Sequence, residues 1–327
     1  MSKIKIAELF YSIQGEGRFM GVPSVFLRTY GCNFKCAGFG MPRGEISIEA
    51  DDIAYTHANI ESFHKYEELP LVTTGCDSYA SWHPAFKDLS PMLTVDAIVD
   101  RIMELLPYNK WRSEHLVITG GEPLLGWQRA YPDLLSHDKM KKLKDITFET
   151  NGTQEISKDF RKYLEKWTHK QGYHNLTFSV SPKLGVSGEK KEDAIRPDIV
   201  REYEELGHTY LKFVVATEED LKDAEQAVQE YRDNGFEGHI YLMPVGGVER
   251  VYNLNNRTVA QMAMQKEQTQ MAQDGNNYRA ELQVAGNMAK NMPPQANEEP
   301  TVEEAPAAPS EEMAAESQPT NEAVVPE

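Results

Sequence analysis

The sequence predicts an α/β fold in which parallel strands alternate with helices, and three observations lead to this prediction. From Thr94 to Pro244, short apolar runs rich in β-branched and aromatic residues alternate with stretches whose apolar residues recur at helical spacing. Several of the apolar runs end in glycine or in polar residues. A change of composition after about residue 253 separates this region from a Gln-, Met- and Asn-rich C-terminal part. Such alternation is typical of βα units around a parallel sheet.

The expected elements follow in order along the chain. Helices are predicted where a capping residue precedes the apolar pattern, as at Thr94 and at Thr217 with Asp220. The helix after Thr217 is expected to bury Leu221, Ala224, Val228 and Tyr231. The predicted strands are 4–14, 24–30, 115–119, 146–150, 176–183, 210–215 and 239–244; the predicted helices are 94–106, 157–170 and 217–231, with a helix-like region up to about 142 and a further helix within 51–66.

Four of the strands end in a polar or glycine-rich signature. These are Gly31-Cys32, Thr119-Gly120-Gly121-Glu122, Glu149-Thr150-Asn151-Gly152 and Ser181-Pro182-Lys183. In α/β barrels and open sheets, chemistry gathers at the C-terminal ends of parallel strands. We therefore expect these four signatures to form one site.

The chain divides into three regions of different composition. Residues 1–253 are expected to form the α/β domain, with 37–75 as a lid or a partner surface, and 254–291 a helical extension. Residues 292–327 are rich in Pro, Glu and Ala, lack aromatic residues, and are predicted to be disordered.

The charge distribution argues against two classes of protein. The net charge is −17, but nine glutamates lie in residues 296–327, which contain no Lys, Arg or Asp; this leaves −8 for residues 1–295. Direct nucleic-acid binding is not expected, because it needs clustered Lys and Arg. No apolar run of about 18 residues and no signal-peptide pattern is found, so we expect a cytoplasmic protein without membrane segments.

The three cysteines are the strongest chemical signal. Cys32 and Cys36 follow a predicted strand, and Cys76 lies 40 residues further on. Three thiols fit a [4Fe-4S] cluster that keeps one iron open for another ligand. Two alternatives remain at this point: a zinc site completed by His64 or His83, or a Cys76 that is simply a buried thiol.

These motifs together resemble the radical S-adenosylmethionine (SAM) enzymes, whose fold is an incomplete (βα) barrel. The resemblance rests on Cys32-x-x-x-Cys36 after one strand and Gly120-Gly121-Glu122-Pro123 after another. Within these enzymes the chain is similar to the 7-carboxy-7-deazaguanine synthase family, through Ser12-Ile13-Gln14-Gly15-Glu16-Gly17, Arg28, Cys76-Asp77-Ser78-Tyr79 and Ser181-Pro182-Lys183. The likeness extends from about Ile4 to Gly246, and more weakly to Asn277-Tyr278-Arg279.

The resemblance implies a carbon–nitrogen lyase with a set of ligand-binding residues. Cys32, Cys36 and Cys76 would hold a [4Fe-4S] cluster whose fourth iron binds SAM, and Ser78 would bind Mg²⁺. One-electron reduction would give a 5′-deoxyadenosyl radical, which starts the ring contraction of 6-carboxy-5,6,7,8-tetrahydropterin to 7-carboxy-7-deazaguanine with loss of ammonia. No catalytic side chain is implied beyond the cluster and this radical. The implied SAM contacts are Gly121, Glu122, Glu149, Thr150, Asn151, Ser181 and Lys183, and the implied substrate contacts are Ile13, Gln14, Gly15, Arg28 and Thr119.

One departure from the family pattern concerns the spacing of the cysteines. The family has two residues between the second and third cysteines, whereas residues 37–75 intervene here. The simplest interpretation is an insertion that loops out between two ligands, since loop closure costs only logarithmically with length. Gly75 stands where the family has an aromatic residue beside the SAM adenine, and Phe39 is a candidate to replace it.

The resemblance also implies partners and leaves rival functions open. We expect a small-molecule pterin substrate, an external electron donor such as flavodoxin, and a homodimer. The product would feed queuosine in tRNA or a 7-deazaguanine modification of DNA. The rival hypotheses are another small radical SAM enzyme, such as a glycyl-radical activase, and a non-enzymatic metal-binding interaction module.

Overall fold

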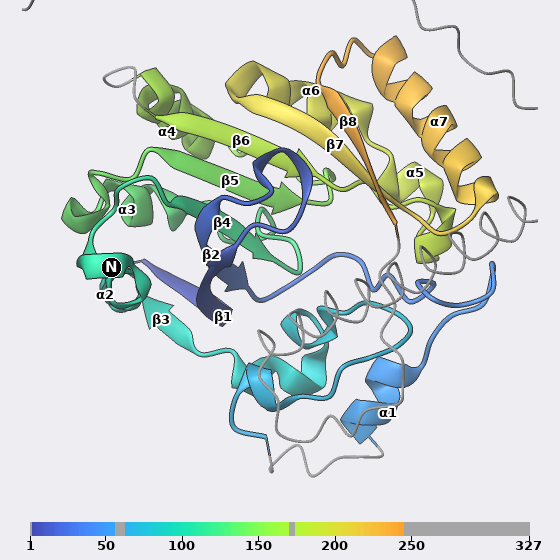
Figure 1. Ribbon diagram of the computed structural model, residues 1–327, viewed down its shortest axis with the longest axis horizontal. Coiled ribbons are helices and arrows are strands. Elements are labelled where there is room, and N and C mark those ends of the chain that lie inside the picture. The colour runs from blue at the N-terminus through green and yellow to red at the C-terminus, as the bar shows by residue number, and fades with distance from the viewer. Residues whose placement is uncertain (1, 56–62, 170–173, 245–327) are drawn as a thin grey trace, which may run out of the picture. The chain divides into compact units, whose positions relative to one another are not determined.

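The computed structural model describes residues 2–55, 63–169 and 174–244, which form an eight-stranded sheet with helices packed on it (Figure 1). The order of the strands is β3-β1-β2-β4-β5-β6-β7-β8. The strands are β1 (Lys3–Ile13), β2 (Pro23–Thr29), β3 (Met92–Thr94), β4 (His115–Gly120), β5 (Asp145–Thr150), β6 (Asn175–Val180), β7 (His208–Val215) and β8 (His239–Pro244).

Most of the sheet is parallel, as the sequence predicts. Strands β2, β4, β5, β6, β7 and β8 pair in parallel in this order, while β1 and β3 are antiparallel additions at one side. Among the described strands, β3 and β8 are the edges of the sheet, so these eight strands form an incomplete barrel. The predicted α/β partial barrel is therefore confirmed, and the C-terminal ends of six strands lie at one end of the sheet.

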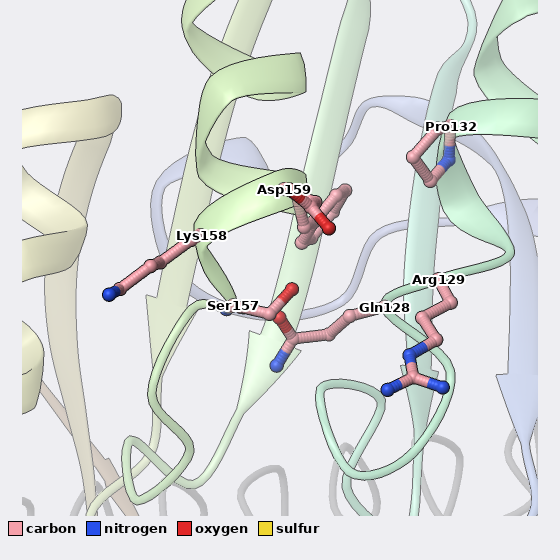
Figure 2. A pocket seen from close by; sticks show the side chains of 7 residues that line it. Gln128, Arg129, Pro132, Ser157, Lys158 and Asp159 are labelled. Atoms are coloured by element: carbon pink, nitrogen blue, oxygen red, sulfur yellow. The ribbon is translucent and has the colours of Figure 1, made fainter.

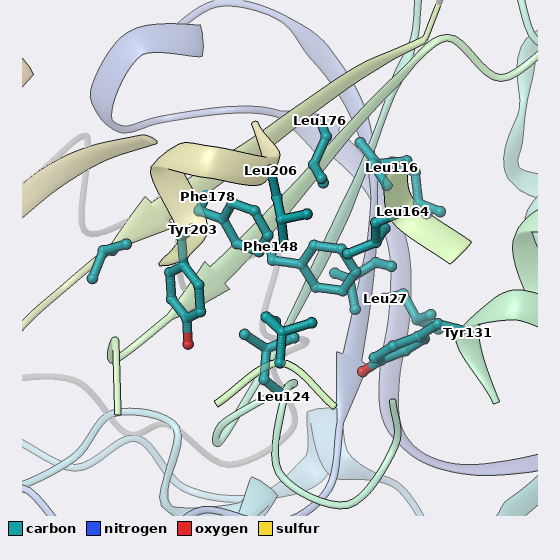
Figure 3. Packing of buried hydrophobic residues seen from close by; sticks show 14 of the residues in the cluster. Leu27, Leu116, Leu124, Tyr131, Phe148, Leu164, Leu176, Phe178, Tyr203 and Leu206 are labelled. Atoms are coloured by element: carbon teal, nitrogen blue, oxygen red, sulfur yellow. The ribbon is translucent and has the colours of Figure 1, made fainter. Parts of the chain in front are cut away.

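Helices cover one face of the sheet and bury the main hydrophobic core between them and the strands. Figure 3 shows part of this core, in which Phe148 and Phe178 from neighbouring strands stack with ring centroids 5.8 Å apart. The helices are α1 (Glu49–Tyr55), α2 (Val95–Leu105), α3 (Tyr131–Ser136), α4 (Lys158–His169), α5 (Lys191–Ala194), α6 (Pro197–Leu206) and α7 (Glu218–Asp233); short 3-10 turns are Gly17–Phe19, Tyr66–Glu68, Tyr79–Ser81, Pro84–Leu89, Pro107–Asn109, Asp138–Met140 and Gly185–Ser187.

Both predicted helix caps are confirmed. The Thr94 hydroxyl accepts the Ala97 N–H at 3.3 Å, and Thr217 and Asp220 form a reciprocal capping box at the start of α7. One packing prediction is wrong. Leu221 of α7 is 38% exposed, and Ala227 is buried in its place beside Ala224 and Tyr231, because the helix is rotated slightly from the predicted face.

Several other expectations differ from the structure or fall outside its described part. A helix was expected within residues 51–66. The described part of this range contains the end of α1, which stops at Tyr55, and Tyr66, which begins a 3-10 turn. The sequence reasoning missed α5, α6 and the short β3. The predictions for 254–291 and 292–327, and the resemblance around residues 277–279, concern residues outside the described ranges. Among the described helices, none combines the length and apolar character needed to cross a membrane.

Candidate active site

The face of the sheet opposite the helices carries polar side chains from successive strands. Side chains alternate between the two faces of a strand, so Leu116 and Ile118 of β4 enter the core while Thr119 points away from it. The strand register places Arg28 beside Thr119 and Glu149 beside Ser179. We call this surface the polar face; it comprises Glu8, Arg28, Thr119, Glu149, Ser179 and Lys212.

The three cysteines lie in one contact cluster at the C-terminal end of the parallel sheet. Buried Cys36 packs with Phe34 and Ala194, and Cys32, Cys76 and Phe39 pack against this group. The backbone of Cys36 is left-handed, with φ of 51°, which is uncommon for a residue with a side chain. The candidate aromatic Phe39 therefore lies beside the thiols, and its contact with the SAM adenine stays a prediction.

The 37–75 segment leaves and rejoins the thiol cluster at adjacent points. The Gly75 N–H donates to the Phe39 carbonyl at 2.7 Å, and the hydroxyls of Ser47 and Thr74 are 2.6 Å apart. A carboxylate oxygen of Glu49 accepts the backbone N–H groups of Thr73 and Thr74, each at 2.9 Å. These bonds close the segment, so Cys76 lies beside Cys36 despite the distance in sequence.

The chemistry of the donor set fits an iron–sulfur cluster. Burial raises the pKa of all three thiols, to about 12 for Cys32, and the positive charge of Lys183 opposes this shift. Among the described residues, no three Cys, His, Asp or Glu side chains converge on one metal ion. A cubane does not require such convergence, because each thiolate binds a different iron. The buried indole N–H of Trp82, unpaired within the described part, lies beside Cys76 as a donor suited to a thiolate sulfur.

Zinc closure by a histidine finds no support among the described side chains. The His83 ring is buried, with Nε2 2.9 Å from Asp51 and Nδ1 accepting the Ala85 N–H at 3.2 Å. Both ring nitrogens are thus occupied. His64 is exposed, and its backbone N–H donates to Glu68.

The glycines after β4 bring the Gly120-Gly121-Glu122 loop against the cysteine loop. A Cβ on Gly121 would stand 2.5 Å from the Gly31 carbonyl oxygen and 2.7 Å from the Cys32 Cβ, so only glycine fits there. The Glu122 N–H also donates to the Gly31 carbonyl at 2.7 Å. The second strand-end signature therefore lies directly beside the first.

Glu122 joins the loop after β4 to the end of β5. Its carboxylate, which is fully buried, accepts from Leu124 N at 3.0 Å, Thr150 Oγ1 at 2.8 Å and Asn151 N at 2.7 Å. Burial raises the pKa of this carboxyl to about 7, against the lowering effect of the three hydrogen bonds. The Asn151 side chain continues the network by donating to Asn33 at 2.9 Å.

Glu149 belongs to a different group from its neighbour Thr150, because adjacent residues in a strand face opposite sides of the sheet. Its carboxylate lies on the polar face and accepts from Gln14 Nε2 at 2.9 Å. Lys212 lies close to it and forms an ion pair of 2.5 Å with Glu16. Burial alone would lower the pKa of Lys212, but the carboxylates of Glu149 and Glu16 outweigh it and raise the pKa.

Arg28 lies on the polar face, held by two partners. Its Nε donates to Glu8 at 3.1 Å and its Nη1 donates to Ser78 Oγ at 3.0 Å, while the Ser78 hydroxyl donates to Asp77 at 3.2 Å. Burial opposes the charge of Arg28, yet nearby Tyr66, Glu8 and Asp77 raise its pKa. Two of the five guanidinium N–H groups thus donate to described side chains.

The last strand-end signature, together with the loop that follows it, contacts the cysteine loop. Lys183 Nζ donates to Ser181 Oγ at 3.3 Å. Further along, one carboxylate oxygen of Glu189 accepts the backbone N–H groups of Lys35 at 2.8 Å and Cys36 at 2.7 Å. The Glu189 carboxylate thus holds the left-handed turn that carries Cys36.

Three further predicted substrate contacts differ in their exposure. The Ile13 side chain is 62% exposed, so a contact between Ile13 and a ligand would come from its backbone. Gly15 is exposed in the loop after β1. Thr119 is buried, and its carbonyl accepts the Thr29 hydroxyl at 3.2 Å.

No protein-family model matches the chain. A curated 7-carboxy-7-deazaguanine synthase from Halobacterium salinarum is 30% identical over 281 residues, which cover 80% of this chain and 85% of that relative. The chain belongs to the 7-carboxy-7-deazaguanine synthase family. Synthases from Pyrobaculum aerophilum and Buchnera aphidicola are 24% and 25% identical, and cover 74% and 77% of this chain. The family predicted from the motifs is confirmed.

Two solved structures resemble this member of the synthase family more distantly. The crystal structure of QueE from Escherichia coli has a TM-score of 0.42 and 21% identity, and covers 74% of this chain and 84% of its own. The crystal structure of Streptococcus suis SuiB bound to S-adenosylmethionine has a TM-score of 0.35 and 17% identity, and covers 55% of this chain and 40% of its own.

Sequence reasoning missed several polar groups that this synthase-family chain places at the site. Glu8, Glu16 and Lys212 form ion pairs there, Tyr66 lies near Arg28, and Glu189 binds the cysteine loop. Lys212 had a signal, because a lysine between Leu211 and Phe213 in a buried strand needs a buried counter-charge. No sequence signal marked Glu8, Glu16, Tyr66 or Glu189, because the groups that they contact are distant in sequence.

A pocket at the start of α4 contains none of the predicted site residues (Figure 2). Gln128 occupies the helix terminus there: it accepts the Ser157 N–H at 2.7 Å and donates to the Glu155 carbonyl at 2.8 Å. The residues that line the pocket are Gln128, Arg129, Pro132, Ser157, Lys158, Asp159 and Phe160. Since none of the candidate site residues lines this pocket, we assign no ligand to it.

Replacing Glu189 with alanine is expected to reduce iron loading by roughly tenfold, because the turn that carries Cys36 loses its acceptor. Iron and sulfide per chain after anaerobic reconstitution measure this effect. Glu192→Ala, a change at an exposed site in the nearby helix α5, serves as the control. Equal iron content in the two variants would contradict the role given to Glu189.

Proposed function

We propose that this chain converts 6-carboxy-5,6,7,8-tetrahydropterin to 7-carboxy-7-deazaguanine with loss of ammonia. The observation that carries the proposal is the meeting of Cys32, Cys36 and Cys76 beside the Gly120-Gly121-Glu122 loop, next to a polar face that presents Arg28. Membership of the synthase family supports the same reaction. The cluster and SAM, when bound, supply the one-electron cleavage that starts the reaction.

The proposed roles follow the positions of the side chains. Cys32, Cys36 and Cys76 would hold the cluster. Gly121, Glu122, Thr150, Asn151, Ser181 and Lys183 would bind SAM around it, and the Glu122 carboxylate, which accepts three hydrogen bonds within the chain, would also hold this loop in place. Glu149, predicted as a SAM contact, would reach SAM only from the polar face, where it binds Gln14.

The substrate would lie on the polar face, which supplies groups of both charges. Ile13, Gln14, Gly15 and Thr119 would meet the pterin edge, and the Arg28 fork would receive the carboxylate. The buried pair Arg28–Glu8, and the ion pair of buried Lys212 with exposed Glu16, hold the two cationic side chains before the substrate arrives, so little ordering is needed on binding. Exclusion of water by the surrounding strands would strengthen each of these interactions.

The proposal extends to partners and location. We propose a cytoplasmic homodimer that receives electrons from an external donor such as flavodoxin, and whose product feeds queuosine in tRNA or a 7-deazaguanine modification of DNA. Homodimers are the commonest oligomers. The acidic balance of the chain supports a small-molecule substrate over direct nucleic-acid binding.

The proposal is tested with the full chain, reconstituted anaerobically with iron and sulfide and reduced with SAM present. We expect 6-carboxytetrahydropterin to yield 7-carboxy-7-deazaguanine, detected by mass spectrometry. Tetrahydropterin without the carboxyl group is the matched control and should not be converted. Formation of 5′-deoxyadenosine without the product would mean a radical SAM enzyme with another substrate, and the proposal would fail.

Magnesium binding at Ser78 is expected to depend on the substrate. The Ser78 hydroxyl accepts from Arg28 Nη1 at 3.0 Å and donates to Asp77 at 3.2 Å, and Mg²⁺ bound there needs oxygens of the substrate to complete its coordination. Ser78→Ala should raise the Mg²⁺ concentration for half-maximal turnover by at least about tenfold. Ser47→Ala, which removes a hydroxyl from the 37–75 segment, is the control. Equal Mg²⁺ affinity with and without substrate would contradict this expectation.

A further inference from the structure

The loop that follows β1 lies along one face of β7. Residues 208, 210 and 212 alternate along β7 and therefore share a face of this strand, and each meets one residue of the loop, in the opposite chain direction. The pairs are His208–Arg18, with 2.8 Å between Nε2 and Nη1, Tyr210–Gly17, and Lys212–Glu16, with 2.5 Å between Nζ and Oε2. A Cβ on Gly17, whose φ is 66°, would stand 2.9 Å from the Tyr210 hydroxyl, so glycine permits this close approach. We call residues 14–18 the strap.

The other end of the strap is fixed to β5. Gln14 is buried, and its Nε2 donates to Glu149 Oε1 at 2.9 Å. Its side-chain oxygen accepts the Glu16 N–H at 3.2 Å, which ties the two ends of the turn together. The strand register aligns Glu149 with Ser179, and Ser179 with Tyr210. The strap therefore crosses three neighbouring strands, β5, β6 and β7, on the polar face.

The charged contact of the strap has its buried end at Lys212. This residue is 7% exposed, whereas the Glu16 side chain is 53% exposed. A buried ammonium needs a counter-charge. If the loop moved away, Lys212 would lose a carboxylate that its burial requires, so the ion pair favours one position of the strap.

We propose that Lys212 is a positioning residue, which holds the strap on the polar face and so places Gln14 and Gly15 against the pterin. Glu16 directly follows these two residues, and its ion pair with Lys212 fixes the backbone beside them. Lys212 acts through Glu16, without a contact of its own to the substrate. This inference rests on the proposed function, because that function puts the pterin against the strap.

The expected consequence concerns binding of the pterin rather than the chemical step. Gly15 and Gly17 flank Glu16, so an untethered strap would adopt many conformations, and the substrate would have to order it on binding. We expect Lys212→Met, which keeps an apolar stem and removes the charge, to raise KM for 6-carboxytetrahydropterin by about tenfold. The kcat should stay within about threefold, and KM for SAM should be unchanged.

A second variant and a double variant show whether Lys212 acts through Glu16. Glu16→Gln should raise KM for the pterin as much as Lys212→Met does. The double variant should raise it no further, because all three proteins lose the same ion pair. Glu16 is exposed, so its variant keeps the test open if Lys212→Met fails to fold.

Two measurements follow the strap without turnover. Equilibrium dialysis of the pterin, on the reconstituted chain with SAM and without reductant, should give the same loss of affinity as KM. Trypsin cleavage after Arg18, an exposed residue of the strap, should be faster in both single variants than in the unsubstituted chain.

Arg18→Gln is the matched control. It removes the exposed contact with His208 at the start of β7, where water can replace the lost partner. This variant should keep the KM of the unsubstituted chain. Melting temperature and iron content are measured for every variant, so that a defect of folding or of cluster loading is recognised separately.

The outcomes separate the two proposals. An equal rise in KM for the pterin in Lys212→Met, Glu16→Gln and the double variant supports the positioning role. A much larger effect of Lys212→Met than of Glu16→Gln, unchanged pterin affinity in both, or an equal rise in Arg18→Gln would overturn it and leave the proposed function intact. Failure of the unsubstituted chain to form 7-carboxy-7-deazaguanine would overturn the proposed function, and the role of Lys212 with it.

Discussion

Replacement of Cys76 by alanine is expected to lower the formation of 7-carboxy-7-deazaguanine by more than about 100-fold. Cys76 lies in the same contact cluster as Cys36 and Cys32, although 39 residues separate it from Cys36. Without its thiolate, one iron of the cluster has no protein ligand, and the open iron can no longer be distinguished from the unligated one. Iron and sulfide content, the electron paramagnetic resonance spectrum after reduction, and product formation measure the loss.

The comparison that decides this prediction is with Cys36→Ala. Both variants remove a thiol from the same cluster, so both should lose the cluster to a similar extent. Thr73→Ala, which removes a hydroxyl bonded to Glu49 near the end of the 37–75 segment, should retain it. A Cys76→Ala protein with a full cluster and normal turnover would show that the third ligand lies elsewhere.

Replacement of Glu122 by alanine is expected to destabilise the folded chain by about 3–5 kcal/mol. The fully buried carboxylate accepts hydrogen bonds from Leu124, Thr150 and Asn151, and its loss leaves three donors without an acceptor and creates a cavity. For a domain of this size the melting temperature should fall by roughly 10 °C. Thermal unfolding of the cluster-free chain measures the effect without interference from metal loading.

Glu189→Ala is the matched control for this stability effect. Its carboxylate also accepts two backbone N–H groups, but it is only partly buried, so water can replace it. We expect its melting temperature to fall much less than that of Glu122→Ala. Similar losses in the two variants would mean that burial of Glu122 is not the source of its contribution.

Much of the fold was predictable because its signals are local. Apolar runs and helical spacing gave the strands and the main helices, and the capping residues Thr94 and Thr217 marked two helix starts. The helix at Pro197–Leu206 also had a local signal, with proline in its first turn and apolar residues at helical spacing, and was overlooked. The strand Met92–Thr94 has only three residues, which is too short for a periodic pattern.

The candidate site was predictable where glycines and strand ends mark it, and not where distant charges meet. Gly121 and the cysteine loop lie together because strands β2 and β4 are parallel neighbours. The pairing of Arg28 with Glu8, and of Lys212 with Glu16, depends on tertiary packing and has no local sequence signature. The position of Tyr66 depends on the fold of the 37–75 segment, in which the sequence pattern predicts only a helix within 51–66.

The closure of the 37–75 segment by the Gly75–Phe39 hydrogen bond has a consequence for the order of events during synthesis. Cys36 is translated 40 residues before Cys76, which corresponds to about 2–8 s at ordinary elongation rates. During this interval the nascent chain offers only two of its three thiols, and the bond that brings the third beside them does not yet exist. Maturation of the metal centre therefore waits for this segment to fold, and an iron–sulfur delivery system would meet a complete acceptor only after it has done so.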